Sequence, residues 1–144
     1  MKVRVFSEKE IKRKELKDNI AIISISSPGL DGIIFDTKNV FYMKFFDLEN
    51  DFGRAKAPKE EDMQGLKEFL DKVRENGVEE IYINCEAGIS RSAGVAAAVE
   101  SYFGLEDTIF CSSYYVPNIR VYRLCLQELG LEEKKSDKYF SLLF

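Results

Sequence analysis

Cys85 and Arg91 are separated by five residues, with Gly88 between them. The segment before Cys85 has the pattern of a buried strand, and the segment from Ser90 onward has that of a buried helix. A loop at such a junction can direct backbone N–H groups and the positive end of the helix dipole at one point. A guanidinium can add two parallel hydrogen bonds to an anion held there. This arrangement predicts a phosphate-binding loop, made of Glu86, Ala87, Gly88, Ile89, Ser90 and Arg91.

Cys85 is the candidate nucleophile of this loop. A helix N-terminus and a guanidinium both favour the thiolate form of a nearby cysteine, so no base is needed to activate it. This matters because the chain has no histidine. That absence excludes Ser-His-Asp triads, Cys-His dyads and histidine-based metal sites. A thiolate beneath a bound phosphate is placed for in-line attack on phosphorus, which gives a phosphocysteine intermediate.

The Cys-x5-Arg spacing alone is a weak signal, and its context makes it specific. The other cysteines, Cys111 and Cys125, are followed at the same spacing by Pro117 and Leu131. Only the stretch around Cys85 combines a preceding strand, an internal glycine and a following helix of small residues. Cys111 and Cys125 are therefore expected to be ordinary buried or partly buried residues.

The elements that would hold this loop alternate along the chain. Runs of β-branched and aromatic residues predict strands over residues 1–6, 20–26, 40–46 and 78–85. Amphipathic or small-residue stretches predict helices over residues 8–17, from Pro58 to a stop at residues 76–77, over 90–102 and over 117–129. This alternation predicts an α/β fold with a mainly parallel central sheet flanked by helices. The length of 144 residues fits a single domain over residues 1–144.

Residues 85–92, Cys-Glu-Ala-Gly-Ile-Ser-Arg-Ser, resemble the signature loop of the protein tyrosine phosphatase superfamily, and of its dual-specificity branch in particular. The mid-chain position of the loop disfavours the low-molecular-weight branch, whose loop lies near the N-terminus. Residues 117–122 are similar to the Pro-Asn helix start of small bacterial and phage members, and the resemblance covers about residues 40–129. It implies a dual-specificity-phosphatase-like fold and hydrolysis of phosphotyrosine through a phosphocysteine, without cofactor or metal. Phosphoserine and phosphothreonine are further candidate substrates.

The resemblance also implies roles for single residues. It implies an aspartate on a loop before the cysteine as the general acid, and both Asp47 and Asp51 are candidates. Asp47 is preferred because it directly follows the strand predicted over residues 40–46. Ser92 matches the hydroxyl that aids breakdown of the phosphocysteine. The family usually has histidine where this chain has Asn84, and because an amide carries no charge, this difference bears on the rate more than on the type of reaction.

Three other functions remain open. A phosphate-binding module without turnover is one alternative, because Asn84 replaces the usual histidine and two aspartates compete for the role of general acid. A phosphatase of non-protein phosphomonoesters is disfavoured by the acidic Glu86 and by the net charge of −4. A sulfur-transferring, rhodanese-type loop is disfavoured by Gly88 and by the serines on either side of Arg91.

The composition of the chain indicates which partners and which cellular compartment to expect. The net charge of −4 disfavours nucleic acid as a partner, and no apolar stretch approaches the ~20 residues of a membrane span. Three widely spaced cysteines and no secretory leader predict a cytoplasmic protein. The expected partner is a phosphorylated protein or a small phosphomonoester, with the oligomeric state open. The apolar segment 139–144 is expected to dock on the body or on a neighbouring subunit.

Overall fold

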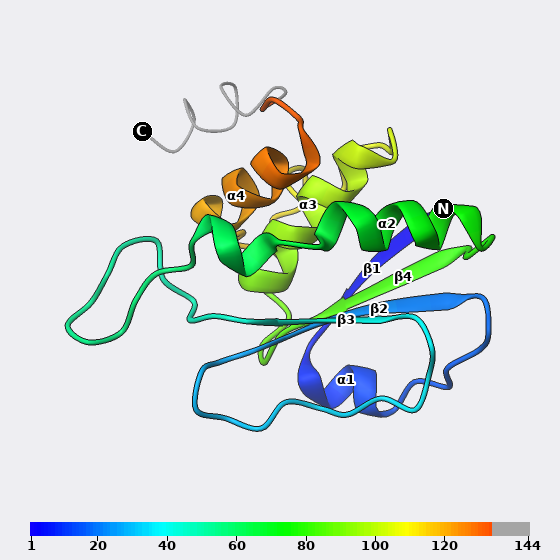
Figure 1. Ribbon diagram of the computed structural model, residues 1–144, viewed down its shortest axis with the longest axis horizontal. Helices are drawn as coiled ribbons and strands as arrows, with labels where there is room; N and C mark the ends of the chain where they lie inside the picture. The colour runs from blue at the N-terminus through cyan, green and yellow to red at the C-terminus, as the bar shows by residue number, and fades with distance from the viewer. Residues whose placement is uncertain (134–144) are drawn as a thin grey trace.

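Four parallel strands form the central sheet of the computed structural model, which describes residues 1–133 (Figure 1). In chain order they are β1 (Lys2–Phe6), β2 (Ile20–Ser26), β3 (Val40–Lys44) and β4 (Glu80–Asn84). In the sheet their order is β1-β4-β2-β3, and every neighbouring pair is parallel. The prediction of an α/β fold with a parallel central sheet flanked by helices is confirmed.

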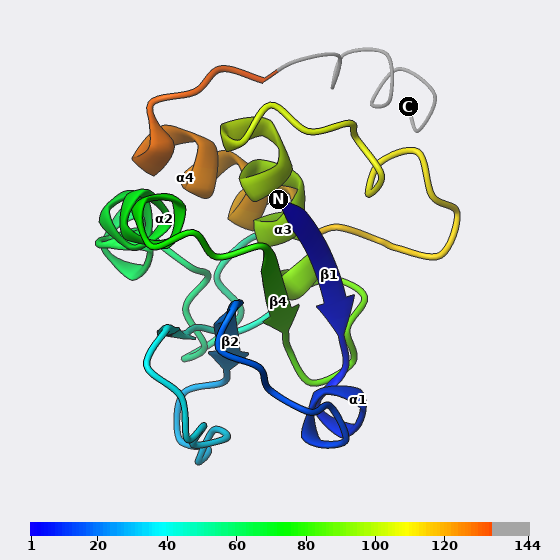
Figure 2. The same cartoon turned by 90° about the vertical axis from the view of Figure 1, so that its right-hand side faces the viewer.

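Helices cover the sheet unequally. The three longer ones, α2 (Leu66–Glu75), α3 (Arg91–Tyr102) and α4 (Ile119–Leu129), lie on one face. The short α1 (Glu8–Lys12) lies below the sheet in Figure 1, close to the loop that follows β4 in Figure 2. A 3₁₀ helix, η1 (Glu60–Met63), precedes α2.

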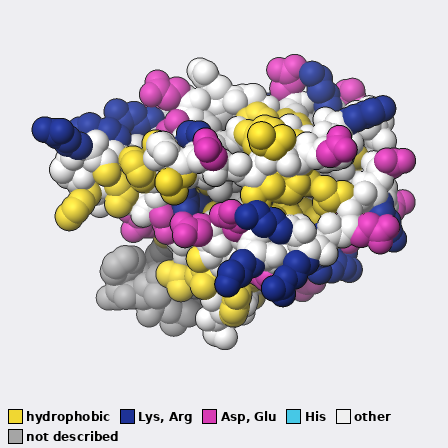
Figure 3. Space-filling view, turned by 90° about the horizontal axis from the view of Figure 1, so that it is seen from below, with side chains coloured by type: hydrophobic (Ala, Val, Ile, Leu, Met, Phe, Trp, Pro, Cys, Tyr) yellow, Lys and Arg dark blue, Asp and Glu magenta, His cyan; other side chains and the backbone are white. Residues whose placement is uncertain are grey.

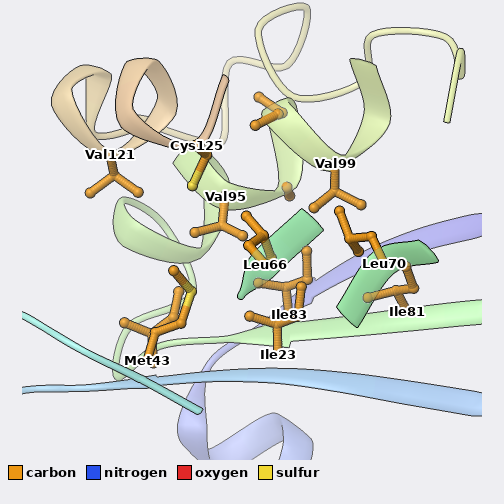
Figure 4. Close-up of a cluster of buried hydrophobic side chains, with 14 of the residues drawn as sticks. Ile23, Met43, Leu66, Leu70, Ile81, Ile83, Val95, Val99, Val121 and Cys125 are labelled. Carbon is orange, nitrogen blue, oxygen red and sulfur yellow. The ribbon is translucent and has the colours of Figure 1, made fainter. Parts of the chain in front are cut away.

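The main hydrophobic core fills the space between the sheet and the three longer helices (Figure 4). Side chains from two strands and three helices meet there: Ile23, Ile83, Leu66, Val95 and Val121. The residues of α3 from Arg91 to Glu100 are all buried, as expected for a helix that is small and apolar nearly all round. Because α3 is enclosed, its first turn has a fixed position relative to the end of β4.

The opposite face of the sheet is covered by α1 and by the long connection between β2 and β3. Ile11 of α1 is buried with Ile22 of β2 and Tyr82 of β4. Ile33 and Phe35 of the connection pack against the same cluster. The central strands β2 and β4 are therefore buried on both faces, as their apolar runs predict.

The prediction of a helix starting at Pro58 is wrong. Pro58 lies outside any helix, a single 3₁₀ turn follows as η1, and α2 begins only at Leu66. Gly65 has a φ of 90°, a left-handed conformation that a continuous right-handed helix does not contain. The predicted apolar face is nevertheless correct, because Leu66, Leu70 and Val73 are buried.

Several predicted boundaries are too wide. α1 ends at Lys12 rather than at residue 17, β3 ends at Lys44 rather than at 46, and β4 spans Glu80–Asn84 rather than 78–85. α3 and α4 begin later than predicted because Ser90 and Asn118 are N-cap residues. Within residues 1–133, no helix has the length and apolar character needed to cross a membrane. The segment 139–144, for which docking is expected, lies outside the described residues.

Candidate active site

Cys85 follows β4 at the carboxyl edge of the sheet. Asn84, the last residue of β4, is in register with Phe6 of β1 and with Ser24 of β2. Ligands of open parallel sheets bind at this edge, outside the carboxyl ends of the strands. From Cys85 the signature loop (residues 85–92) turns into α3, as the path from β4 to α3 in Figure 2 shows. The fold thus places the predicted anion site where parallel sheets hold ligands.

Gly88 lets this loop pass against the end of β1. It has a φ of 71°, and a Cβ at this position would lie 2.5 Å from Ser7 N and 2.6 Å from the Phe6 carbonyl carbon. No larger residue fits unless the backbone moves. The Gly88 N–H donates to Cys85 Sγ over 3.3 Å, so the same residue shapes the loop and contacts the candidate nucleophile.

Backbone hydrogen bonds hold carbonyl groups of the loop outward. Three loop carbonyls accept from N–H groups of neighbouring segments: Glu86 O from Glu8 N (3.1 Å), Ile89 O from Val116 N (3.1 Å) and Ser90 O from Asn118 N (3.0 Å). In a trans peptide the C=O and N–H groups point in opposite directions. The N–H groups of Ala87, Ser90 and Arg91 therefore point away from these anchors, toward the inside of the loop. Such converging N–H groups are the geometry of a backbone anion nest.

Ser92 provides a second contact to the sulfur of Cys85. The two residues are 0% and 2% exposed, respectively. Ser92 Oγ lies 3.0 Å from Cys85 Sγ, and a hydroxyl can rotate to donate to a thiolate. The sulfur is therefore positioned by a backbone N–H on one side and by a hydroxyl on the other.

The guanidinium of Arg91 is held by the loops that follow β2 and β3. Arg91 is 6% exposed, and its Nη1 donates to Ser27 Oγ and to the Phe45 carbonyl, both over 2.9 Å. These bonds use both hydrogens of Nη1 and leave the edge formed by Nε and Nη2, which carries paired N–H groups suited to a phosphate. Ser27 and Phe45 are positioning residues that the sequence analysis did not identify.

Asp47 lies against the signature loop, although it comes from the loop after β3. Its Oδ1 accepts from Ser90 Oγ over 2.8 Å and from Asn118 Nδ2 over 2.9 Å. Its side chain lies at the surface, so the carboxyl is held in place while remaining accessible to a ligand.

Asn118 links α4 to the loop after β3, which carries Asp47 and is called the acid loop below. Its Nδ2 also donates to the Leu48 carbonyl over 3.2 Å, while its Oδ1 accepts from Val121 N over 3.0 Å and so caps α4. Sequence reasoning noted the Pro-Asn helix start but not this contact with the acid loop. The signal was the N-cap asparagine itself, because a side chain with one acceptor and two donors can cap a helix and hold a carboxylate at once.

Asp51, the other candidate acid, is turned toward its own loop. Its Oδ1 accepts from Ala57 N over 2.9 Å, and its Oδ2 lies 3.7 Å from Lys56 Nζ. The Ala57 N–H, aided by the charge of Lys56, lowers the pKa of Asp51. A lowered pKa keeps the carboxyl ionised, which is the wrong form for donating a proton.

Two hollows adjoin the signature loop. The Asp47 hollow, about 450 Å³, is lined by Asp47 and Ser90 and by the exposed side chains of Phe52 and Val116. The Asn84 cavity, about 240 Å³, is lined by other residues, among them Asn84 and Arg91.

The two remaining cysteines have different environments. Cys125 is buried, and burial raises the pKa of its thiol, so it is inert at neutral pH. Cys111 is exposed, and the expectation that it is buried or partly buried is wrong. It lies in the irregular segment between α3 and α4, whose residues the pattern analysis did not assign to an element.

A comparison with models of known protein families finds no match for this chain, and a search of curated proteins finds none either. The geometry of the site therefore carries the functional argument. The structure brings the predicted residues Cys85, Ser92, Arg91 and Asp47 to one edge of the sheet. It leaves Asp51 without a hydrogen bond to the signature loop among the described residues.

Proposed function

We propose that this chain is a cysteine-dependent phosphomonoesterase with a dual-specificity-phosphatase-like form of the α/β fold. Its substrates are cytoplasmic proteins that carry phosphotyrosine, and also phosphoserine or phosphothreonine. The observation that carries the proposal is the sulfur of Cys85 at the base of a loop whose carbonyls are anchored outward. A phosphate held by the N–H groups of that loop lies over a nucleophile, which is the requirement for phosphoryl transfer through cysteine.

In the first step, the Cys85 thiolate attacks phosphorus, and the P–O bond to the leaving group breaks. The phosphate oxygens accept bonds from the loop N–H groups and from the Nε and Nη2 edge of Arg91. Protonated Asp47 donates its proton to the leaving oxygen, so that a neutral phenol or alcohol departs. The contacts of Asp47 with Ser90 and Asn118 support this role because they hold the carboxyl beside the loop.

In the second step, water attacks the phosphocysteine and the S–P bond breaks. The Asp47 carboxylate takes a proton from this water, and inorganic phosphate leaves with the Cys85 thiolate restored. Ser92 Oγ, 3.0 Å from the sulfur, donates to the thiolate as it departs. This contact lowers the barrier to breakdown of the intermediate.

The Asp47 hollow supports an aromatic leaving group. Phe52 and Val116 are 78% and 66% exposed, and both line this hollow together with Asp47 and Ser90. Apolar side chains next to a general acid suit the ring and the ester oxygen of phosphotyrosine.

The experiment is turnover of p-nitrophenyl phosphate and of a phosphotyrosine peptide by wild type, Cys85→Ser and Cys111→Ser. Cys85→Ser should lose turnover and keep peptide binding, whereas Cys111→Ser changes an exposed cysteine outside the signature loop and should remain active. Retention of more than about a tenth of the wild-type kcat by Cys85→Ser, roughly 1.4 kcal/mol, would exclude Cys85 as the nucleophile. Phosphate binding by wild type without turnover would identify a phosphate-binding module.

A further inference from the structure

The two residues that follow Asn118 in α4 also donate hydrogen bonds to the acid loop. The Ile119 backbone N–H donates to Glu49 Oε1 over 3.0 Å, and Arg120 Nη1 donates to the Glu49 carbonyl oxygen over 3.2 Å. Asn118 itself donates to Asp47. Three consecutive residues at the start of the helix therefore hold the beginning of the acid loop.

Arg120 binds both stems of the acid loop. Its Nε donates to the Pro58 carbonyl oxygen over 2.6 Å, while its Nη1 donates to the Glu49 carbonyl oxygen. Glu49 lies where the loop leaves β3, and Pro58 lies where it approaches η1. A guanidinium is planar and rigid, so its donors fix two acceptors at a set separation. This Arg120 clasp, which consists of Arg120 and the carbonyls of Glu49 and Pro58, closes residues 50–57 at their base.

The part of the loop beyond the Arg120 clasp is closed on itself. Phe52 and Ala55 exchange two backbone hydrogen bonds, of 2.9 and 3.0 Å, and Asp51 Oδ1 accepts from Ala57 N. Residues 51–54 are exposed, and the loop projects from the body of the molecule in Figure 1. Basic and apolar side chains gather at this projecting end, at the left of Figure 3. The loop is therefore positioned through its stems rather than through its tip.

The helix that carries the Arg120 clasp is firmly packed. The backbone N–H of Asn118 donates to the Ser90 carbonyl over 3.0 Å, which ties the start of α4 to the signature loop. The residues of α4 that are buried lie just beyond this start: Val121, Tyr122, Cys125, Leu126 and Leu129. The same helix start therefore contacts the signature loop and the acid loop, and it sets their separation.

The contacts to Asp47 leave one of its carboxyl oxygens for the reaction. Oδ1 accepts from Ser90 Oγ and from Asn118 Nδ2, whereas none of residues 1–133 donates a hydrogen bond to Oδ2. A protonated carboxyl carries its hydrogen on one oxygen and accepts through the other. Oδ2 is thus the oxygen that carries the proton. A misplacement of about 1 Å at a reacting group costs on the order of 10²-fold in rate, so the position of the loop matters.

We propose that Arg120 is a positioning residue for the general acid, an inference that rests on the proposed phosphatase function. Through the stems of the acid loop, Arg120 holds Asp47 so that its Oδ2–H faces the leaving oxygen. Arg120 is not among the described residues that line the Asp47 hollow, and it lines a separate one with Lys59 and Glu60. Loss of Arg120 should therefore affect the transfer of the proton and spare the binding of phosphate.

The test compares phenyl phosphate with p-nitrophenyl phosphate, because phenol is the poorer leaving group and needs the acid more. Arg120→Met removes the guanidinium and keeps an apolar stem. It should lower kcat/KM for phenyl phosphate on the order of 10-fold, and that for p-nitrophenyl phosphate by less than about twofold. A loss of folded protein would lower both values equally, so their ratio reports the acid.

Two comparisons assign this change to Asp47 and to the Arg120 clasp. In an Asp47→Asn background the acid is already lost, so adding Arg120→Met should leave the ratio of the two substrates unchanged. Arg123→Met removes a guanidinium from the same helix, where Arg123 is paired with Glu133. This control should keep the wild-type ratio.

Hydrogen exchange followed by mass spectrometry measures the Arg120 clasp without turnover. In Arg120→Met the amides of residues 50–57 should exchange faster than in wild type, because the stems are no longer held together. The amides of β2 should exchange as in wild type. Arg123→Met should match wild type in both segments.

The outcomes separate the two proposals. An equal loss of kcat/KM for both substrates in Arg120→Met would overturn the positioning role and leave the phosphatase intact. A further change of the ratio in the Asp47→Asn background would also overturn it, because Arg120 would then act without the acid. Unchanged exchange in residues 50–57 would overturn it as well. If wild type hydrolyses neither substrate, the phosphatase proposal fails instead, and the exchange data alone decide whether Arg120 positions the loop.

Discussion

Arg91 is anchored through one nitrogen and keeps its other edge for a ligand. In Arg91→Lys the charge remains, but the paired N–H groups are lost. The expected fall in kcat/KM for a phosphotyrosine peptide is on the order of 10²-fold, or roughly 2.7 kcal/mol of transition-state stabilisation. Steady-state kinetics measure this, with Arg4→Lys on β1 as the matched control. Near-normal kinetics for Arg91→Lys would contradict its role as the phosphate ligand.

The two aspartates are distinguished by their hydrogen-bond partners. Asp47 contacts the signature loop, whereas Asp51 is held by Ala57 and has a lowered pKa. A general acid must be protonated, so loss of its proton produces the descending limb of the pH–rate profile. Asp47→Asn should flatten that limb and slow phosphotyrosine far more than p-nitrophenyl phosphate, whose leaving group needs less protonation.

Asp51→Asn is the control for this prediction, because it makes the same change in the same loop. Its pH–rate profile should keep the descending limb of wild type. If Asp51→Asn removed the limb and Asp47→Asn did not, the assignment of the acid would be reversed.

At the scale of elements, the turn from β4 into α3 depends on Gly88. Gly88→Ala adds a Cβ that would meet Ser7 N at 2.5 Å, at a φ of 71°. Strain at such a φ costs on the order of 1–3 kcal/mol by itself, and the backbone clash adds to it. Chemical denaturation should show a loss of at least about 2 kcal/mol in the free energy of unfolding.

Gly104→Ala isolates the effect of the clash. Gly104 has a φ of 67°, but nothing lies within 4 Å of its added Cβ, so only the conformational cost applies. Equal destabilisation by the two variants would show that the contact of the signature loop with β1 is not close.

Glu100, on α3, makes the stability of the folded state depend on pH. Glu100 is buried, and burial raises its pKa, while hydrogen bonds from Thr108 oppose the rise only in part. The folded state therefore binds the proton more tightly than the unfolded chain, whose carboxyl has a pKa near 4.5. Stability from this group is present below that value and is lost as pH rises through the folded pKa.

Glu100→Gln removes this titration while keeping an oxygen that can accept from Thr108. Urea denaturation between pH 4 and pH 8 should show that the free energy of unfolding of the variant falls less with rising pH than that of wild type. The same slope in both proteins would contradict the assignment of this pH dependence to Glu100.

Local patterns predict the elements better than they predict the partners of the site. The run that forms β2 is nearly continuous in β-branched and apolar residues, and β4 has consecutive apolar residues from Ile81 to Ile83, so burial on both faces could be predicted from them. The helix expected at Pro58 failed because the left-handed conformation of Gly65 is not visible in a periodic pattern. The spacing in the sequence was enough to predict that Cys85 and Arg91 lie in the same site, because both belong to one loop.

The contacts that hold the acid could not be predicted in this way. Asp47 and Asn118 are far apart in the chain, and only the packing of α4 beside the loop after β3 brings them together. The anchor of Arg91 on Ser27 likewise depends on the strand order, which places β2 next to β4. Such contacts arise from topology, so no local spacing contains them.

At the scale of the whole molecule, the site is assembled at one edge of the sheet. The loops after β2, β3 and β4 and the start of α4 each contribute to it, through Ser27, Asp47, the signature loop and Asn118. Both faces of the central strands are buried against helices and the β2–β3 connection. The proposed chemistry therefore requires all of these segments, and a covalent intermediate on Cys85 would be its most direct product.

The proposed reaction passes the phosphoryl group through Cys85, and mass spectrometry after a denaturing quench can detect this covalent intermediate. Asp47→Asn mixed with p-nitrophenyl phosphate should still form the phosphocysteine, because the leaving group is good. It should break it down slowly, because the base that activates water is gone. One phosphoryl group is expected on the peptide that contains Cys85, and none in Cys85→Ser. A phosphoryl group on another residue, or rapid turnover that persists in Cys85→Ser, would contradict it.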